Sequence, residues 1–319
     1  MRIGLDVLGG DFAPRSPLEG SLLALKELPK SDRLVLFGDE PQIRSFLSEK
    51  NIDPAWVDIV HAPEQIQMDE QPTKAIANKP NSSISAGFRK LKHREIDAFA
   101  SAGSSGAMVV GAIYSVNTIP GIIRPASPAY IAKVSGGMTI LIDVGINPDC
   151  KPDVLYQIGL LGSLFAEYVY HIHHPKVGLL NIGSEEKKGN LVTQSAYQLM
   201  TGNTDFNFVG NVEGRDLFLD HADVIVCDGF IGNIVLKQTE AIYEVLRLRS
   251  VNDEFLSRLN YELYGGSPIL GVNGNVVVGH GISKPAAICK MILLAADITH
   301  ADLTGHIRKA FEHKELNNI

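Results

Sequence analysis

The residues best suited to chemistry follow short apolar runs that the sequence predicts as strands. Residues 101–107 read Ser-Ala-Gly-Ser-Ser-Gly-Ala, come after the apolar run 98–101, and lead into a helix predicted to begin near Ser105. Free N–H groups at a helix start, together with hydroxyl groups, suit a phosphate ion. The same residues also suit a serine N-cap, which needs no ligand. The segment matches neither a Walker A loop nor the GxGxxG motif, so ATP and dinucleotides are disfavoured as its ligands.

A second candidate loop, residues 181–190, follows the apolar run 177–182 and carries carboxylates, two lysines and amides. Its lysine Lys188 and its amide Asn181 suit an anion, or the negative charge that develops on a carbonyl oxygen. The alternative is a solvated turn, because charged runs usually lie on the surface.

Polar residues also follow two other apolar runs. Asp228 follows run 224–227, and Asn233 stands at the start of the next predicted helix, where it suits either a ligand or helix capping. Cys227 lies inside the apolar run and is interpreted as a core residue rather than a nucleophile. His280 lies between two glycines after the run 276–278, and it suits either a ligand or a structural turn.

The sequence does not favour a metal site or a serine-hydrolase mechanism. His171, His173 and His174 cluster without a helical i, i+4 pair or a nearby acid, so we predict no metal site. The sequence has no GxSxG nucleophile elbow. The basic run 89–94 ends a predicted helix, where it complements the helix dipole or receives an acidic partner.

These residues are connected by alternating strands and helices. Continuous apolar strands separated by helices predict a mostly parallel sheet covered on both faces. Six of the strand runs end in glycine with polar neighbours, and the carboxyl ends of parallel strands form a ligand crevice. The predicted strands are residues 3–7, 34–37, 57–60, 98–101, 140–144, 177–182, 207–212 and 224–227, and the predicted helices are residues 17–28, 41–49, 82–92, 105–117, 154–170, 191–200 and 234–249.

Bulk composition narrows the class of protein. Residues 1–319 are predicted to form a single α/β domain, in which the Pro- and Gly-rich segment 118–127 is either a long loop or a hinge between two lobes that hold the crevice between them. A net charge of -7 disfavours nucleic acid, and three scattered cysteines fit a reducing compartment. The N-terminus does not read as a signal peptide, and the longest apolar stretch, 107–116, is too short to span a bilayer. A cytoplasmic protein is therefore expected.

Taken together, the segments resemble one family, the bacterial phosphate acyltransferases of phospholipid synthesis, also called acyl-carrier-protein:phosphate acyltransferases. The resemblance covers residues 3–294. Phe12 stands where the family has a histidine, and Ser104 and Ser105 stand where it has Asn and Thr. The matching segments are residues 6–11, 101–107, 120–126, 181–190, 210–216, 227–237, 264–274 and 280–281.

The resemblance implies transfer of a long-chain acyl group from acyl carrier protein to inorganic phosphate, without a cofactor or metal. The acyl phosphate then feeds a membrane glycerol-3-phosphate acyltransferase. The implied fold has three α/β/α layers, similar to isocitrate and isopropylmalate dehydrogenases and to phosphotransacetylase. A homodimer with peripheral contact at the inner membrane face is also implied.

Strand-end position and the resemblance together assign the site. Lys188 and Asn233 are expected to stabilise the oxyanion or the phosphate, and His280 to protonate the leaving thiolate. The expected phosphate- and substrate-binding residues are Ser101, Gly103, Ser104, Ser105, Asn181, Asp228 and Arg215.

Two other classes of function compete with this hypothesis. One is a metal- and NAD-dependent decarboxylating dehydrogenase, which the fold analogy suggests but for which no dinucleotide fingerprint is found. The other is a non-catalytic scaffold or binding module of lipid synthesis, which would not need so many polar strand ends.

Overall fold

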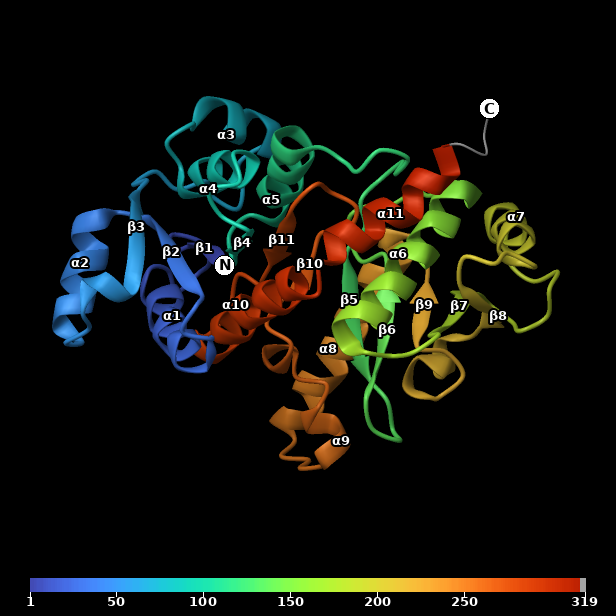
Figure 1. Ribbon diagram of the computed structural model, residues 1–319. Helices are drawn as coiled ribbons and strands as arrows, with labels where there is room; N and C mark the ends of the chain where they lie inside the picture. The colour runs from blue at the N-terminus through green and yellow to red at the C-terminus, as the bar shows by residue number, and fades with distance from the viewer. Residues whose placement is uncertain (316–319) are drawn as a thin grey trace. The chain divides into compact units, whose positions relative to one another are not determined.

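A computed structural model describes residues 1–315 of the chain, which form two compact units (Figure 1). Unit 1 comprises Met1–Thr118 and Glu262–Thr304, and unit 2 comprises Ile119–Tyr261 and the segment that begins at Gly305. The chain enters unit 2 within the Pro- and Gly-rich segment that the sequence marks as a break. Each unit has its own sheet, so the single predicted sheet is in fact two.

The unit 1 sheet has six strands in the order β10-β11-β4-β1-β2-β3, and all of its pairs are parallel except β10 with β11. Its elements are β1 (Arg2–Asp6), α1 (Arg15–Glu27), β2 (Arg33–Gly38), α2 (Glu40–Glu49), η1 (Pro54–Trp56), β3 (Val57–His61), α3 (Pro72–Asn78), α4 (Ser83–Lys92), β4 (Ala98–Ser101), α5 (Ser105–Gly111), the π-helix η2 (Ala112–Val116), β10 (Ser267–Pro268), β11 (Asn275–Val278) and α10 (Pro285–His300).

Helices cover both faces of this sheet. Figure 1 shows α1 and α10 together on one side of the unit 1 sheet and α4 with α5 on the other. On the α4 side, Phe99 of β4 meets Phe88 and Phe37 edge to face, with ring centroids 5.3 and 5.5 Å apart. Such buried apolar surface supplies most of the favourable free energy of folding.

The unit 2 sheet has five strands in the order β5-β6-β9-β7-β8, with only the edge strand β5 antiparallel. The chain passes between the units again at the 3-10 helix η4 (Tyr261–Leu263) and near the start of α11 (Leu303–Glu315). The elements within unit 2 are β5 (Pro128–Ala132), β6 (Met138–Ile142), α6 (Pro152–Tyr170), β7 (Lys176–Leu180), α7 (Leu191–Met200), β8 (Asn207–Val212), the 3-10 helix η3 (Gly214–Phe218), β9 (Val224–Val226), α8 (Gly229–Leu248) and α9 (Glu254–Ser257).

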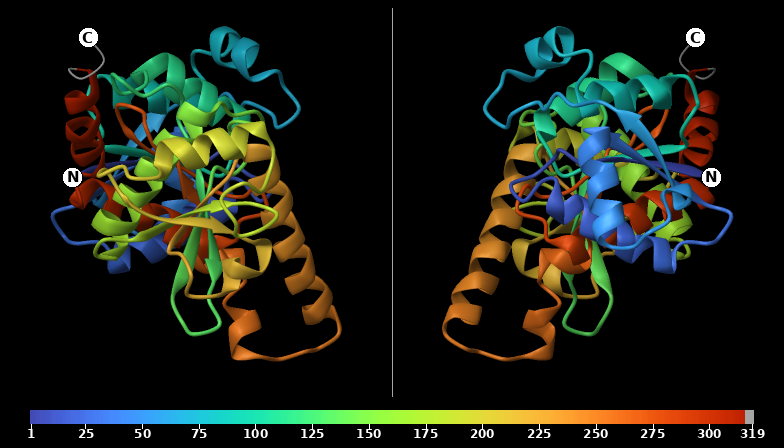
Figure 2. Two further views of the ribbon diagram at one scale, coloured as in Figure 1. Left: turned by 90° about the vertical axis from the view of Figure 1, so that its right-hand side faces the viewer. Right: turned by 90° about the vertical axis from the view of Figure 1, so that its left-hand side faces the viewer.

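The two faces of this sheet are covered differently. On one face α6 packs closely, since Gly162 lies against Ile142 and Val224. On the other, Val235 and Leu236 of α8 pack on an apolar cluster that β5, β6, β8, β9 and η3 contribute. Only the first part of α8 lies over the sheet, and Figure 2 shows the helix running past it to the short helix α9.

Two features of residues 1–315 bear on the class of protein. Within this range no helix has the length and apolar character needed to cross a membrane. The same residues contain no group of three or more His, Cys, Asp or Glu side chains placed to hold a metal ion.

Candidate functional site

In unit 1, three turns meet at the carboxyl end of the sheet. The strands β1 and β4 are paired in parallel, so the turns after Asp6 and after Ser101 lie next to each other. The strand β11 pairs with β4 on its other side, and the Gly279 N–H donates to the Ser101 carbonyl oxygen at 2.9 Å. The structure therefore brings the predicted phosphate turn and the His280 turn together.

The Ser101 hydroxyl is used inside the protein rather than offered to a ligand. Ser101 is fully buried, donates to the Asp6 carboxylate at 2.7 Å, and accepts from the Gly103 N–H at 2.9 Å. Both hydrogen bonds are internal, and they hold the predicted phosphate turn in shape. Gly103 itself packs against the backbone of Gly9, with 3.2 Å between its ideal Cβ position and the Gly9 Cα.

The next two serines take different positions. Ser104 is 4% exposed and is the N-cap of α5, where its hydroxyl accepts from the Ala107 N–H at 3.4 Å. Ser105 is exposed at the start of the helix. The capping interpretation therefore holds for Ser104, while the exposed serine of this segment is Ser105.

In unit 2, Asn181 fixes the loop that carries Lys188. Its backbone N–H donates to the Val212 carbonyl oxygen at 2.8 Å, which ties the ends of β7 and β8 together. Its side-chain amide donates to the Lys188 carbonyl oxygen at 3.1 Å and to Asn211 Oδ1 at 3.1 Å. The Lys188 side chain is 49% exposed, and its Nζ lies 3.9 Å from Glu185. Asn181 thus positions a cation that remains accessible.

Asp228 and Asn233 belong to the first turns of α8. Asp228 is the N-cap, and its Oδ1 accepts from the Ile231 N–H at 2.8 Å. The alternative that Asn233 caps this helix is therefore wrong. Asn233 is exposed, and its side chain reaches to 3.9 Å from the ideal Cβ position of Gly145.

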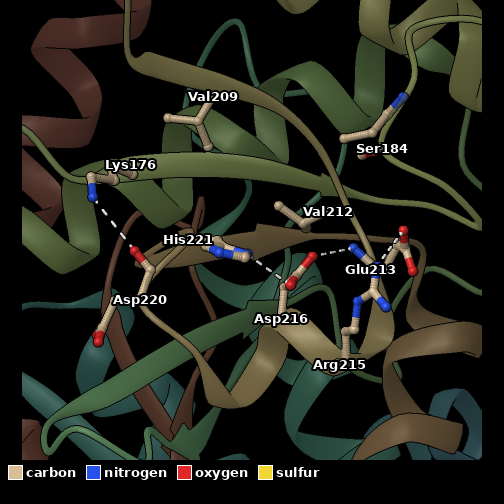
Figure 3. A pocket seen from close by; sticks show the side chains of 10 residues that line it. Lys176, Ser184, Val209, Val212, Glu213, Arg215, Asp216, Asp220 and His221 are labelled. Carbon is tan, nitrogen blue, oxygen red and sulfur yellow. Dashed lines mark hydrogen bonds and ion pairs between the residues drawn. The ribbon is translucent and has the colours of Figure 1, made fainter.

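Arg215 lines a polar cavity of about 520 Å³ beside β8 and η3 (Figure 3). Its guanidinium donates to Glu213 at 3.2 Å. In the same cavity His221 Nδ1 lies 2.8 Å from Asp216, which also accepts from the Glu213 N–H at 2.8 Å. The acids of this cavity are thus already engaged by the protein. Its lining consists of Lys176, Ser184, Val209, Asn211, Val212, Glu213, Arg215, Asp216, Asp220 and His221.

Two buried carboxylates, Asp6 in unit 1 and Asp143 in unit 2, are not among the site residues predicted from the sequence. Asp6 is 1% exposed and Asp143 is fully buried, and burial raises the pKa of both. A shared signal marks them in the sequence, namely an apolar strand that ends in Asp with glycine two or three residues later. The sequence does not predict their burial, because lone carboxylates rarely lie in a core.

The cysteines do not supply a nucleophile. Burial raises the pKa of the Cys227 thiol well above its ordinary value and that of Cys150 to about 12. Because the thiolate is the reactive form, both thiols are poor nucleophiles at neutral pH. The structure thus agrees with the interpretation of Cys227 as a core residue.

Comparisons with solved structures identify the fold. The chain resembles the EutD phosphotransacetylase of Staphylococcus aureus, with a TM-score of 0.64, 16% identity and 94% of each chain covered. It also resembles a 4-hydroxythreonine-4-phosphate dehydrogenase from Klebsiella pneumoniae, with a TM-score of 0.56 and 14% identity over 93% of this chain and 99% of the other. At such identities the likeness establishes the α/β fold alone.

Sequence comparisons identify the family. Residues 1–305 match the model of a family described as fatty acid synthesis protein. The chain is 39% identical over 327 residues to the phosphate acyltransferase of Dictyoglomus thermophilum, with 96% of each covered. It is 41% identical over 335 residues to that of Pelotomaculum thermopropionicum, with 99% of this chain and 96% of the relative covered. The chain therefore belongs to the phosphate acyltransferases, enzymes of the fatty acid synthesis protein family.

Proposed function

We propose that this phosphate acyltransferase moves a long-chain acyl group from the thioester of acyl carrier protein to inorganic phosphate. A phosphate oxygen attacks the thioester carbonyl carbon and forms the C–O bond, and the C–S bond then breaks. The thiolate takes up a proton and leaves as the free thiol of the carrier. The product, an acyl phosphate, is the substrate of a membrane glycerol-3-phosphate acyltransferase.

The observation that carries this proposal is the accessible Lys188, held by Asn181 at the end of β7. Phosphate is an anion at neutral pH and needs no base to activate it, so the protein has to place it and stabilise the tetrahedral oxyanion. Lys188 would serve the oxyanion or the phosphate, with Asn233 in support. His280 would protonate the leaving thiolate.

In unit 1, the turn after β4 would hold phosphate. Its exposed residue is Ser105 at the start of α5, while Ser101 keeps the turn in shape from within. A hydroxyl and backbone N–H groups suit a phosphate oxygen. In unit 2, Asp228 and Arg215 would orient the groups near the carbonyl, Asp228 through its cap on α8.

An acidic carrier protein needs a local basic surface on a chain whose net charge is -7. The end of α4 offers one, because Lys92 and Arg94 form no ion pair with any residue of the described range 1–315, whereas Lys90 pairs with Glu95. A second candidate surface at the ends of α8 and α9 contains Arg247, Arg249 and Arg258.

We further propose a cytoplasmic homodimer that contacts the inner membrane face peripherally. The support is the outer face of α8, where apolar side chains are exposed and no described element of unit 2 covers them. An exposed apolar stripe of this kind suits a partner or a lipid surface. Its members are Phe230, Ile231, Ile234, Ile242, Val245, Leu248 and, just beyond the helix, Val251.

The decisive test mixes the purified protein with palmitoyl acyl carrier protein, with and without phosphate, and traps acyl phosphate with hydroxylamine. We expect phosphate to increase the formation of hydroxamate and free carrier protein well above the phosphate-free level. The phosphate-free reaction controls for direct attack of hydroxylamine on the thioester. A folded protein that gives no phosphate-dependent product with several chain lengths would favour the scaffold alternative.

A further inference from the structure

Asp143 stands at the carboxyl end of β6 and binds the protein around it through N–H donors alone. Its Oδ1 accepts from the Ser127 N–H at 2.9 Å, and its Oδ2 accepts from the backbone N–H of Asn147 at 2.6 Å and from the Asn147 side-chain amide at 3.0 Å. Among residues 1–315 it has no cationic partner. A carboxylate can accept on both oxygens, whereas an amide in its place would turn an NH₂ group toward one of these donors.

Asn147 extends this network to two more segments. Its side-chain amide donates to the Pro125 carbonyl oxygen at 2.7 Å, and its own carbonyl oxygen accepts from the Gly229 N–H at 2.7 Å. The Gly145 N–H in turn donates to the Gly229 carbonyl oxygen at 3.0 Å. Asp143 and Asn147 thus join the segment before β5, the turn after β6 and the first residue of α8.

The first turn of α8 also rests directly on Asp143. A Cβ atom at Gly229 would lie 2.7 Å from Asp143 Oδ2, and one at Gly232 would lie 1.9 Å from the Asp143 carbonyl oxygen. Only glycine permits this approach at either position. Asn233 follows Gly232 immediately, and its side chain lies beside Gly145 of the same network. The position of Asn233 therefore depends on Asp143.

We propose that Asp143, with Asn147, is a positioning residue for acyl transfer: it fixes the first turn of α8 and so the placement of Asn233 at the strand ends. The proposal rests on the proposed function for the role of Asn233. Asp143 itself is buried and does not touch a substrate. Its effect on the reaction is to keep Asn233 within the small range of positions that catalysis tolerates.

A purely structural role has to be separated from positioning, and Asp223 provides the matched control. Asp223 is also partly buried in unit 2, but it stands at the amino end of β9, where it accepts from Lys133 at 2.8 Å and from the Lys176 N–H at 2.9 Å. Asp223→Asn leaves Lys133 buried with a weakened partner, so it should destabilise the protein without moving the strand ends.

The experiment measures kcat, the KM for phosphate and the melting temperature of the full chain for Asp143→Asn and Asp223→Asn. We expect kcat of Asp143→Asn to fall on the order of 10²-fold with little change in KM, because misplaced reacting groups act on turnover. Asp223→Asn should lose melting temperature but keep kcat within about twofold, since its site lies away from the chemistry. A folded Asp143→Asn variant with the kcat of Asp223→Asn would overturn the proposal.

Three further variants keep the test decisive. If Asp143→Asn does not fold, Asn147→Ala takes its place, with the same expected loss of kcat and the same overturning result.

Asn233→Ala separates the proposal from the proposed function: wild-type kcat in that variant removes Asn233 from the site whatever Asp143 does. If Asn233→Ala is impaired, the double variant Asp143→Asn, Asn233→Ala should be less impaired than the product of the two single effects, because both act through one group. Fully multiplicative losses would show that Asp143 does not act through Asn233.

Discussion

The sheets of both units have a buried aspartate at a strand end, but the polar groups around these strand ends differ. Asp6 in unit 1 and Asp143 in unit 2 are both buried at a strand end without a cation among residues 1–315, and each lies against glycine backbone. Around Asp6 the turns offer hydroxyl groups and backbone. Around the unit 2 strand ends stand charged side chains, Lys188 and Arg215 among them. The strand ends of unit 1 thus present hydroxyl groups and backbone, while those of unit 2 present charged side chains.

The largest expected effect comes from removing the charge of Lys188 in unit 2, which tests this difference between the units directly. We expect Lys188→Ala to lower kcat by about 10²–10³-fold, as the loss of an oxyanion donor does in other enzymes. The neighbouring Lys187→Ala is the matched control and should keep its turnover. Steady-state kinetics with acyl carrier protein as donor would measure both variants. Near-normal turnover in a folded Lys188→Ala protein would remove the charge of unit 2 from the mechanism.

In unit 1, we expect an effect from replacing Ser101, whose side chain faces the protein interior. Ser101→Ala takes one donor from the buried Asp6 and leaves the Gly103 N–H without its acceptor. We expect a loss of about 1–3 kcal/mol in the free energy of unfolding, the usual cost of an unsatisfied buried group. Urea unfolding would measure it. A rise in the KM for phosphate should accompany the loss, because the turn that we propose to hold the ion is loosened.

Ser21→Ala is the control for this prediction. Ser21 is another buried serine of unit 1, but within the described residues 1–315 its hydroxyl bonds only to the Leu18 carbonyl oxygen of α1. It should cost less stability and leave the KM for phosphate unchanged. If both variants raise the KM equally, the effect of Ser101 is one of general stability rather than of the turn.

The sequence predicted the elements with a clear hydrophobic period better than the others. The predicted helix 191–200 agrees with α7 (Leu191–Met200), and predicted helix 154–170 begins two residues inside α6. The helix α10 was missed because apolar residues occupy nearly all of its faces, so it shows no amphipathic period. The strand β5 was missed because it follows a Pro- and Gly-rich segment and forms a hairpin rather than a strand-helix unit.

The site was predictable in its positions and not in its contacts. The rule that polar residues gather at the carboxyl ends of parallel strands placed Ser101, Asn181 and Asp228 correctly at strand ends. Hydrogen bonding then divided them, since Ser101 faces inward, Asn181 supports Lys188 and Asp228 caps α8. Sequence order alone does not show which polar group turns toward the core, because that depends on partners 95 residues away, as for Ser101 and Asp6.

The smallest expected effect concerns the pH dependence of Asp6. Burial raises the pKa of this carboxyl although Ser101 and backbone N–H groups favour its ionised form. The folded protein therefore holds the Asp6 proton more tightly than the unfolded chain does. The resulting stabilisation is full below the unfolded pKa and is lost as the pH rises through the folded pKa.

Asp6→Asn removes this titration and leaves those of Asp143 and Asp297, whose pKa values are also raised. We expect the free energy of unfolding of the wild type, minus that of Asp6→Asn, to fall as the pH rises from the acid side, by at most about 1.4 kcal/mol per pH unit. Urea unfolding of both proteins over a pH series would measure the difference. A difference that rises with pH would mean that the donors around Asp6 outweigh its burial. In that case Ser101 and the backbone N–H groups of the turn, rather than burial, would decide the direction of the Asp6 pKa shift.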